Sequence, residues 1–261
     1  MSIATVSNRL IHYEVVGRGK PLLFVHGWLG SWRYWWPTMQ GLTAQHRALA
    51  VDLWGFGDSS KLPQFYNLPA YVTLLRQFLD YLGGADPVTL VGHGLGAAVA
   101  LRFTLAYPEQ VERLATVALP VHGRHLDARL AQLDPESYSG KVLGKHNQFS
   151  ELTSEIHKTD PRAMRESANE ILQASFAGDL LACTRPLLML HGSRDRVVTP
   201  PTAEYQSQLN GHRHYVTLEE CDHFPMLQAP AQFNRLLLDF GLAGELIDHI
   251  APKIYWQRRT R

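Results

Sequence analysis

The sequence predicts an α/β fold: a mainly parallel, eight-stranded twisted sheet with helices on both faces and a small helical lid. Three observations support this fold class. Short apolar runs alternate with stretches of helical periodicity along most of the 261 residues, which is the pattern of parallel strands joined by crossover helices. Glycine-containing turns directly follow several of the apolar runs. A polar segment over residues 121–183 interrupts the alternation before it resumes.

Eight stretches are expected to be strands. The first two alternate in polarity, as edge strands do, and the third is a continuous apolar run typical of a strand buried on both faces. In chain order the eight are Ile3–Val6, Leu10–Val16, Pro21–Val25, Ala48–Val51, Val88–Val91, Leu114–Leu119, Leu187–Leu190 and His214–Leu218.

Helices are expected between and after these strands. The apolar residues of the second helix, Ala70, Leu74 and Phe78, recur at helical spacing. The expected helices are Tyr34–Leu42, Leu68–Leu82, Leu95–Ala106, Thr202–Leu209 and Gln232–Phe240. Residues 1–120 and 184–261 would form the core domain, and residues 121–183 an inserted helical cap. Such folds bind ligands at the carboxyl edge of the sheet, where we expect the cap to lie.

Within the cap segment, two Asp-Pro dipeptides are expected to be helix starts or turns, Asp134-Pro135 and Asp160-Pro161.

The composition is that of an ordinary globular protein, with 45% hydrophobic and 19% charged residues. A formal net charge of +1 gives no reason to expect nucleic acid or an acidic membrane as a partner. No apolar run approaches the roughly 18 residues needed to span a bilayer. Cys183 and Cys221 lie far apart in a chain without a secretory leader, so we expect a cytoplasmic protein without disulfides. We expect it to act on a small molecule, as a monomer or a homodimer.

The stretch Val91–Ala98 (VGHGLGAA) joins an apolar run to a helical one, which predicts a strand, a tight turn and a helix. Taken alone, it matches the loose Gly-x-Gly-x-x-Ala fingerprint of a dinucleotide site. Such a site also has an acidic residue at the end of the next strand, to bind the ribose. Here no carboxylate follows that strand until Asp127. The sequence therefore disfavours a dinucleotide, and we expect no cofactor.

Four other polar stretches each follow a predicted strand. They are His26–Gly30 (HGWLG), Asp52–Ser59 (DLWGFGDS), His191–Val198 (HGSRDRVV) and Asp222–Pro225 (DHFP). Together with the glycine turn, and in this order, they resemble the α/β-hydrolase superfamily, which includes esterases, lipases and C–C hydrolases. The similarity runs from about Leu10 to Phe240. Each motif alone is weak, but five in one order, each just past a strand, are specific.

The resemblance implies roles for five residues. Gly94 stands at the nucleophile position, Asp195 at the acid position and His223 at the general-base position, which is the chain order of this fold. The main-chain N–H groups of Trp28 and Leu95 would form the oxyanion hole. Because glycine has no side chain, no covalent acyl-enzyme can form at residue 94. We expect the space left there to hold a water molecule.

Residues in and beside the same turns are expected to line a substrate pocket. They are His26, Gly27, His93 and Trp32. Because tryptophans are unusually dense near the expected oxyanion turn, the substrate is expected to be apolar or aromatic.

The remaining acidic and histidine residues are expected to be structural. Asp52 and Asp58 are expected to be structural, and Asp58, which follows Gly57, can satisfy N–H groups of its loop. Two histidine pairs are also present, His122 with His125 and His212 with His214. Neither pair has acidic or cysteine neighbours at ligand spacing, so no metal site is expected.

Four functions remain open at this point. The favoured one is hydrolysis of an ester or related carbonyl substrate, in which Asp195 and His223 activate water. A second keeps this pair but uses it for a lyase or a cofactor-free oxygenase. In a third, Gly94 is an engineered replacement of the nucleophilic serine of an ordinary esterase. The fourth is a catalytically inactive, ligand-binding pseudo-hydrolase, because fold alone does not fix function.

Overall fold

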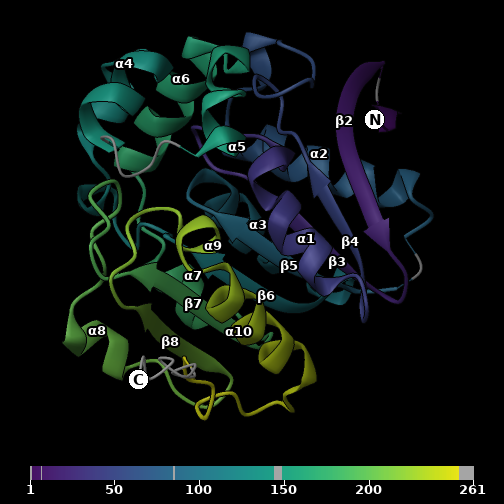
Figure 1. Cartoon of the computed structure of the whole chain (residues 1–261), viewed down its shortest axis with the longest axis vertical. Coiled ribbons are helices and arrows are strands. Elements are labelled where there is room, and N and C mark those ends of the chain that lie inside the picture. Colours follow the sequence, from purple (N-terminus) through teal and green to yellow (C-terminus); the bar gives the residue numbers. More distant parts are fainter. Residues whose placement is uncertain (1, 7, 85, 144–148, 253–261) are drawn as a thin grey trace, which may run out of the picture.

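The computed structural model of the chain describes residues 2–6, 8–84, 86–143 and 149–252. Its centre is an eight-stranded sheet with the strand order β1-β2-β4-β3-β5-β6-β7-β8 (Figure 1). β2 pairs antiparallel with both β1 and β4, and the other neighbouring strands pair in parallel. The strands are β1 (Ser2–Val6), β2 (Arg9–Gly17), β3 (Lys20–Val25), β4 (His46–Val51), β5 (Val88–His93), β6 (Val111–Val117), β7 (Leu187–Gly192) and β8 (Arg213–Leu218). The predicted fold class is confirmed.

The predicted strands are all present, with shifts at their ends. β6 stops at Val117 rather than Leu119, because Ala118 has a φ of +50°, outside the extended conformation of a strand. β5 continues two residues further than predicted, to His93, and runs directly into the glycine turn.

Helices follow the strands in the predicted alternation. The helix expected over Tyr34–Leu42 is a 3₁₀ turn, Trp32–Trp35, followed by α1, whereas α3 has the predicted bounds. The α-helices are α1 (Trp36–Leu42), α2 (Leu68–Tyr81), α3 (Leu95–Ala106), α4 (Pro135–Tyr138), α5 (Ser150–Thr153), α6 (Pro161–Leu172), α7 (Ala177–Ala182), α8 (Ala203–Ser207), α9 (Pro225–Gln228) and α10 (Pro230–Leu242). Asp134 and Asp160 cap the first turns of α4 and α6, confirming the predicted helix starts.

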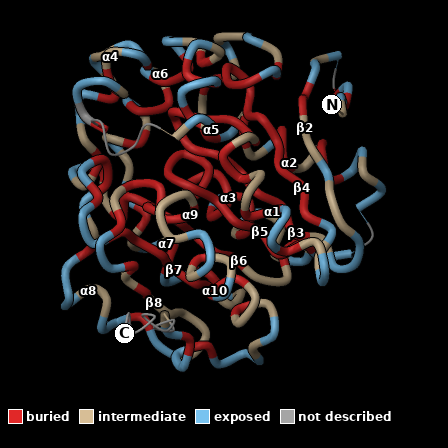
Figure 2. The backbone as a smooth tube through the Cα atoms, in the orientation of Figure 1, coloured by how far each residue is buried: buried red, intermediate tan, exposed pale blue. Residues whose placement is uncertain are grey.

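Helices cover both faces of the sheet. α1 and α10 contact each other in front of it, and α2 and α3 pack together behind it (Figure 1). Between these layers the strands and the inner helix faces are buried (Figure 2). Burial on both faces explains the continuous apolar sequences of β3 and β5.

Close packing of α3 against β3 depends on Gly96. A Cβ atom on Gly96 would lie 2.3 Å from the carbonyl oxygen of Val25 and 2.5 Å from that of His26. Because both obstacles are backbone atoms of a central strand and the turn after it, no side-chain rotation relieves the clash. The first turn of α3 therefore lies against the end of β3 only because residue 96 is glycine.

The chain between β6 and β7 is mostly helical, and none of its described residues belongs to a strand of the sheet. This insertion includes α4 to α7. Its helices α4, α5 and α6 lie across one end of the sheet, at the top of Figure 1, whereas α7 lies lower and contacts α3. The buried Glu155 of the insertion accepts hydrogen bonds from the Ser31 hydroxyl at 3.0 Å and from Arg33 Nε at 2.8 Å. The main-chain N–H of Asp160 donates to the Gly55 carbonyl at 2.7 Å. These bonds hold the insertion on the loops that follow β3 and β4.

The start of the insertion also pairs with the loop after β7 through the main chain. Leu126 and Val198 form an isolated antiparallel bridge. On either side of it, Asp127 N–H donates to the Val197 carbonyl at 2.9 Å and Thr199 N–H to the His125 carbonyl at 2.8 Å. The two segments therefore form a miniature two-stranded ribbon.

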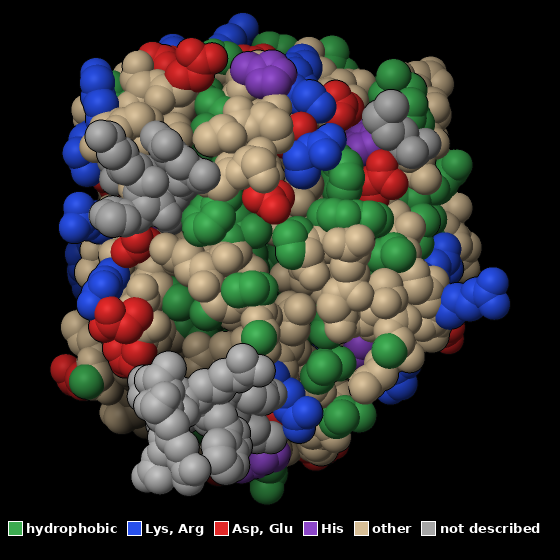
Figure 3. Space-filling view, in the orientation of Figure 1, with side chains coloured by type: hydrophobic (Ala, Val, Ile, Leu, Met, Phe, Trp, Pro, Cys, Tyr) green, Lys and Arg blue, Asp and Glu red, His purple; other side chains and the backbone are tan. Residues whose placement is uncertain are grey.

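Acidic and basic side chains are interspersed over the face shown in Figure 3, which carries no broad area of one sign. Among the described helices, none combines the length and the apolar character that a membrane crossing demands.

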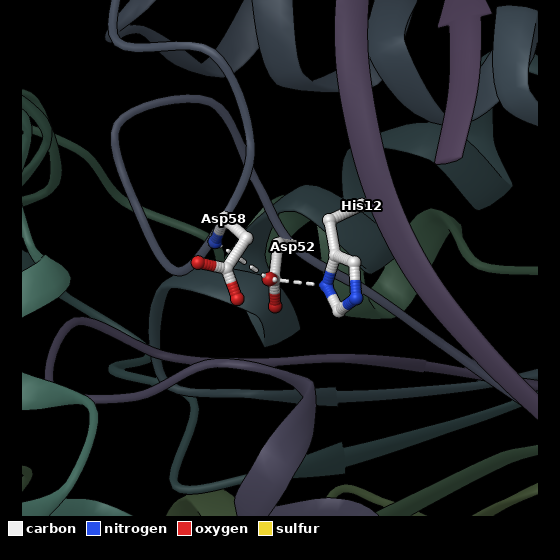
Figure 4. A group of neighbouring side chains, drawn as sticks. All are labelled: His12, Asp52 and Asp58. Atoms are coloured by element: carbon white, nitrogen blue, oxygen red, sulfur yellow. Dashed lines mark hydrogen bonds and ion pairs between the residues drawn. The ribbon is translucent and has the colours of Figure 1, made fainter. Parts of the chain in front are cut away.

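A buried hydrogen-bonded group joins β2 to the loop after β4 (Figure 4). His12 Nδ1 lies 2.9 Å from Oδ2 of Asp52, and the two side chains are 2% and 0% exposed. Oδ1 of Asp52 accepts the main-chain N–H of Trp32 at 2.7 Å, and Oδ2 accepts that of Asp58 at 3.0 Å. Burial alone would lower the pKa of His12, but the hydrogen bond and charge of Asp52, with the charges of Asp58 and Glu14, raise it above 6.5.

The substitution Gly96→Ala tests the packing of α3. We expect it to destabilise the protein by about 1–3 kcal/mol, because the added methyl overpacks a rigid contact. Gly178→Ala in α7 is the matched control, since nothing lies within 4 Å of its Cβ position, and alanine there should stabilise by about 0.5–1 kcal/mol. Urea unfolding measures both. Equal stabilities of the two variants would contradict the account of Gly96.

The raised pKa of His12 predicts how stability depends on pH. The ion pair with Asp52 contributes fully below the unfolded-state pKa of about 6.5 and is lost as pH rises through the higher folded-state pKa. We expect the stability advantage of the wild type over His12→Asn, which retains a donor but no charge, to shrink as the pH rises above about 6.5. Urea unfolding across this range checks it; a difference independent of pH would show that folding leaves the pKa of His12 unchanged and would contradict the prediction.

Candidate active site

A sharp turn connects β5 to α3 at Gly94. This residue has φ +52° and ψ −112°, a left-handed conformation that costs residues with a Cβ atom energy. Its N–H donates to the Val117 carbonyl at 2.9 Å, and its carbonyl accepts the N–H of Ala97 at 3.1 Å. The turn thus has the strained strand-to-helix geometry that exposes a nucleophile in this fold, although the residue has no side chain.

The structure brings Asp195 and His223 together. Nδ1 of His223 lies 2.9 Å from Oδ2 of Asp195, and both side chains are buried. The other carboxylate oxygen, Oδ1, accepts the N–H groups of Val197 at 2.8 Å and Val198 at 3.0 Å. Because an ionised carboxylate only accepts, Nδ1 of His223 carries the proton, and Nε2 of the neutral ring has a free lone pair. Arg194 pairs with Glu220 instead of Asp195.

The expected oxyanion-hole donors are the main-chain N–H groups of Trp28 and Leu95, of which Leu95 directly follows Gly94. Trp28 and Leu95 are 1% and 0% exposed, and Leu95 is the first residue of α3. Among the described residues, neither main-chain N–H has a hydrogen-bond acceptor. Buried N–H groups are rarely left without a partner, so these two donors are free to bind an oxygen of a ligand.

The indole of Trp28 covers Gly94. A Cβ atom on Gly94 would lie 3.1 Å from Cζ3 and 3.3 Å from Cε3 of this ring. The indole Nε1–H donates to Oγ of Ser167 in α6 at 3.1 Å. The space beside Gly94 is therefore tighter than the sequence led us to expect, and a side chain fits only if the indole moves by a few tenths of an ångström. The bond from Trp28 to Ser167 was not predicted, since nothing in the sequence relates residues so far apart.

The histidines expected in the pocket use both ring nitrogens within the protein. His26 Nδ1 donates to the Gly27 carbonyl at 2.8 Å, and its Nε2 accepts the Leu53 N–H at 3.0 Å. His93 bonds through one nitrogen to the Tyr34 hydroxyl and through the other to the His223 carbonyl. Burial lowers the pKa of both histidines, that of His93 strongly. Their contribution to a pocket is thereby limited to ring carbons.

Trp32 and Gly27 have different surroundings. The Trp32 ring packs against His12 at 5.9 Å and against Trp36 at 5.7 Å between centroids, so it lies beside the buried group of β2. Gly27 lies under His93, since a Cβ on it would be 3.0 Å from Nδ1 of that ring.

The closest approach to a metal site among the described residues is the group His12, Asp52 and Asp58, whose possible ligand atoms lie within 4.8 Å of one another. The arrangement does not fit a metal. Both Asp52 oxygens already accept N–H groups, and the Asp58 carboxylate pairs with Lys158 at 2.9 Å. Asp52 is structural, as predicted. Asp58 is structural as well, but its carboxylate pairs with Lys158 of the insertion, where the prediction had N–H groups of its own loop.

The chain matches a model of the alpha/beta hydrolase family over residues 22–236. It is 27% identical over 250 residues to a pimeloyl-[acyl-carrier protein] methyl ester esterase of Nitrosomonas europaea, covering 85% of this chain and 96% of the relative. It is 28% identical over 255 residues to a 2-hydroxy-6-oxo-2,4-heptadienoate hydrolase of Pseudomonas putida, covering 88% and 91%. A soluble epoxide hydrolase of a Corynebacterium species is 35% identical over 111 residues, 42% of this chain and 38% of the relative.

Solved structures agree on the fold. The enol-lactonase of Burkholderia xenovorans superposes with a TM-score of 0.80 at 18% identity, over 93% of this chain and all (100%) of that one. At this identity the superposition supports the architecture alone. The family match, which extends over most of the sequence, shows that the chain belongs to the alpha/beta hydrolase family.

Proposed function

We propose that this chain hydrolyses an ester or a related carbonyl compound with water activated by His223 and Asp195, without a covalent intermediate. The observation that carries the proposal is the 2.9 Å bond between these side chains, because it leaves Nε2 of His223 able to accept a proton. The unpartnered N–H groups of Trp28 and Leu95 supply the complementary donors.

The reaction follows from these groups. Nε2 of His223 takes a proton from water as the water oxygen attacks the carbonyl carbon. Negative charge develops on the carbonyl oxygen, and the N–H groups of Trp28 and Leu95 stabilise it, an effect that is usually the largest single contribution to catalysis. The tetrahedral intermediate then expels the alcohol oxygen, which takes the proton back from His223. Asp195 stays ionised and stabilises the imidazolium meanwhile. The products are an acid and an alcohol.

The substrate class proposed is a small apolar or aromatic compound, enclosed by a cap formed from residues 121–183. Support comes from Trp28, whose ring lies at the turn and is held by Ser167 of the insertion. Two relatives that align along most of the chain are named for a methyl ester and an oxo-dienoate, both of which contain a carbonyl group. We further propose a cytoplasmic monomer or homodimer, which fits two buried, free cysteines.

One observation favours a second candidate, a ligand-binding protein without catalysis. The Trp28 ring comes within 3.1 Å of the Cβ position of residue 94, where it leaves little room for an attacking water. In this candidate the two free N–H groups bind a carbonyl or carboxylate oxygen, and His223 only contacts the ligand.

Removal of the base separates the two candidates. We expect His223→Ala to lower hydrolysis of p-nitrophenyl butyrate by about a hundredfold or more, because general-base assistance is lost. His157→Ala, at an exposed histidine of the insertion, is the control and should keep the wild-type rate. Circular dichroism confirms folding of both. If His223→Ala hydrolyses the ester as fast as the wild type and His157→Ala do, His223 is not a base, and the binding function is favoured.

Residue 94 tests for a covalent step. We expect the wild type to keep its hydrolytic rate after exposure to a serine-directed fluorophosphonate, because it has no nucleophile at the turn. Gly94→Ser should gain a phosphonyl adduct detectable by mass spectrometry, whereas Gly94→Ala, which adds the same Cβ without a hydroxyl, should not. An inert wild type combined with a fast Gly94→Ser variant would refute water activation and indicate a serine esterase lacking its serine.

A further inference from the structure

A buried chain of hydrogen bonds passes through His93, the residue directly before Gly94. The Gly27 N–H lies 2.6 Å from the Tyr34 hydroxyl oxygen, which lies 2.9 Å from Nδ1 of His93. Nε2 of His93 lies 2.9 Å from the main-chain carbonyl oxygen of His223. All four residues are buried, so solvent does not compete for these bonds.

The direction of every bond in this chain is determined. The His223 carbonyl can only accept, so Nε2 of His93 carries a proton and donates it. Nδ1 of the neutral ring is then an acceptor, and it receives the Tyr34 hydroxyl proton. The tyrosine oxygen in turn accepts the Gly27 N–H. Burial lowers the pKa of His93 and raises that of Tyr34, so both stay neutral and the directions persist.

This series of hydrogen bonds connects two parts of the site that follow different strands, β3 and β8. Gly27 follows β3 and immediately precedes Trp28, whose N–H is one of the two free donors. His223 follows β8 and carries the base. Packing reinforces the connection, because the His93 ring lies 4.4 Å from that of His223 between centroids and 5.5 Å, edge-on, from that of Tyr34.

We propose that His93 and Tyr34 are positioning residues that set the distance between the donor of Trp28 and the base of His223. They act through the main chain of Gly27 and His223 and do not touch the reacting atoms. The inference rests on the proposed function and deepens it, because it assigns the histidine of the glycine turn to alignment and not to substrate binding. A shift of either loop would separate the oxyanion donor from the base, and misplacement by about 1 Å costs on the order of a hundredfold in rate.

The test is Tyr34→Phe, which removes one hydroxyl and keeps the ring. Tyr71→Phe is the matched control, since Tyr71 is also fully buried and its hydroxyl donates to the Trp54 carbonyl at 3.1 Å. We expect both variants to lose similar stability. Only Tyr34→Phe should lower kcat for p-nitrophenyl butyrate, by about tenfold to a hundredfold with little change in KM.

A second readout does not depend on hydrolysis. The Nδ1 proton that His223 shares with Asp195 should give a low-field proton resonance. We expect it to broaden through faster solvent exchange in Tyr34→Phe and to stay sharp in Tyr71→Phe. If the wild type proves inactive, the proposed function fails while this measurement still decides the alignment role. An unchanged resonance in Tyr34→Phe would overturn the inference, whatever the activity.

A double-mutant cycle checks that Tyr34 and His93 belong to one hydrogen-bond network. His93→Phe removes both of its bonds, so adding Tyr34→Phe should broaden the resonance no further, as expected of residues that share one network. Additive effects of the two substitutions would show that they act separately and would refute the connected chain.

Discussion

The hydrogen bond between Asp195 and His223 is the interaction on which the proposed chemistry of this site depends. It orients the imidazole, because one carboxylate oxygen of Asp195 accepts two main-chain N–H groups and the other lies 2.9 Å from Nδ1 of His223. Everything else at the site arranges atoms around the remaining nitrogen. The sheet does so by ending β5, β7 and β8 at the same edge, where their loops meet.

Gly94 leaves the turn between β5 and α3 without a nucleophilic side chain. The sharp turn is present although its central residue has no reactive side chain, and the Trp28 ring packs against the position that a Cβ would take. Glycine adopts this conformation at no steric cost. The turn therefore still positions the free N–H of Leu95, although it carries no nucleophile. In the proposed reaction such a site stabilises charge on an oxygen without a covalent bond to the substrate.

Sequence patterns predicted the parts of the molecule that depend on local chemistry. Apolar runs placed all eight strands, α3 has its predicted bounds, and the Asp-Pro pairs begin helices where expected. The order of the motifs also predicted the pairing of Asp195 with His223, which the structure shows. The end of β6 was predicted wrongly, because it depends on the positive φ of Ala118, a conformation that the sequence does not indicate for an alanine. The bonds of Trp28 to Ser167 and of Tyr34 to His93 were missed as well. They form between segments that only the folded chain brings together.

The miniature ribbon of Leu126 and Val198 has a consequence for how this architecture diversifies. Its second strand directly continues the loop whose Val197 and Val198 N–H groups hold the acid. Exchange of the whole insertion for that of a relative would therefore remove a main-chain partner of the loop that binds Asp195. A graft that keeps this loop supported must retain the paired segment and begin downstream of Asp127. The unit that can be exchanged independently thus starts inside the insertion and not at its first residue.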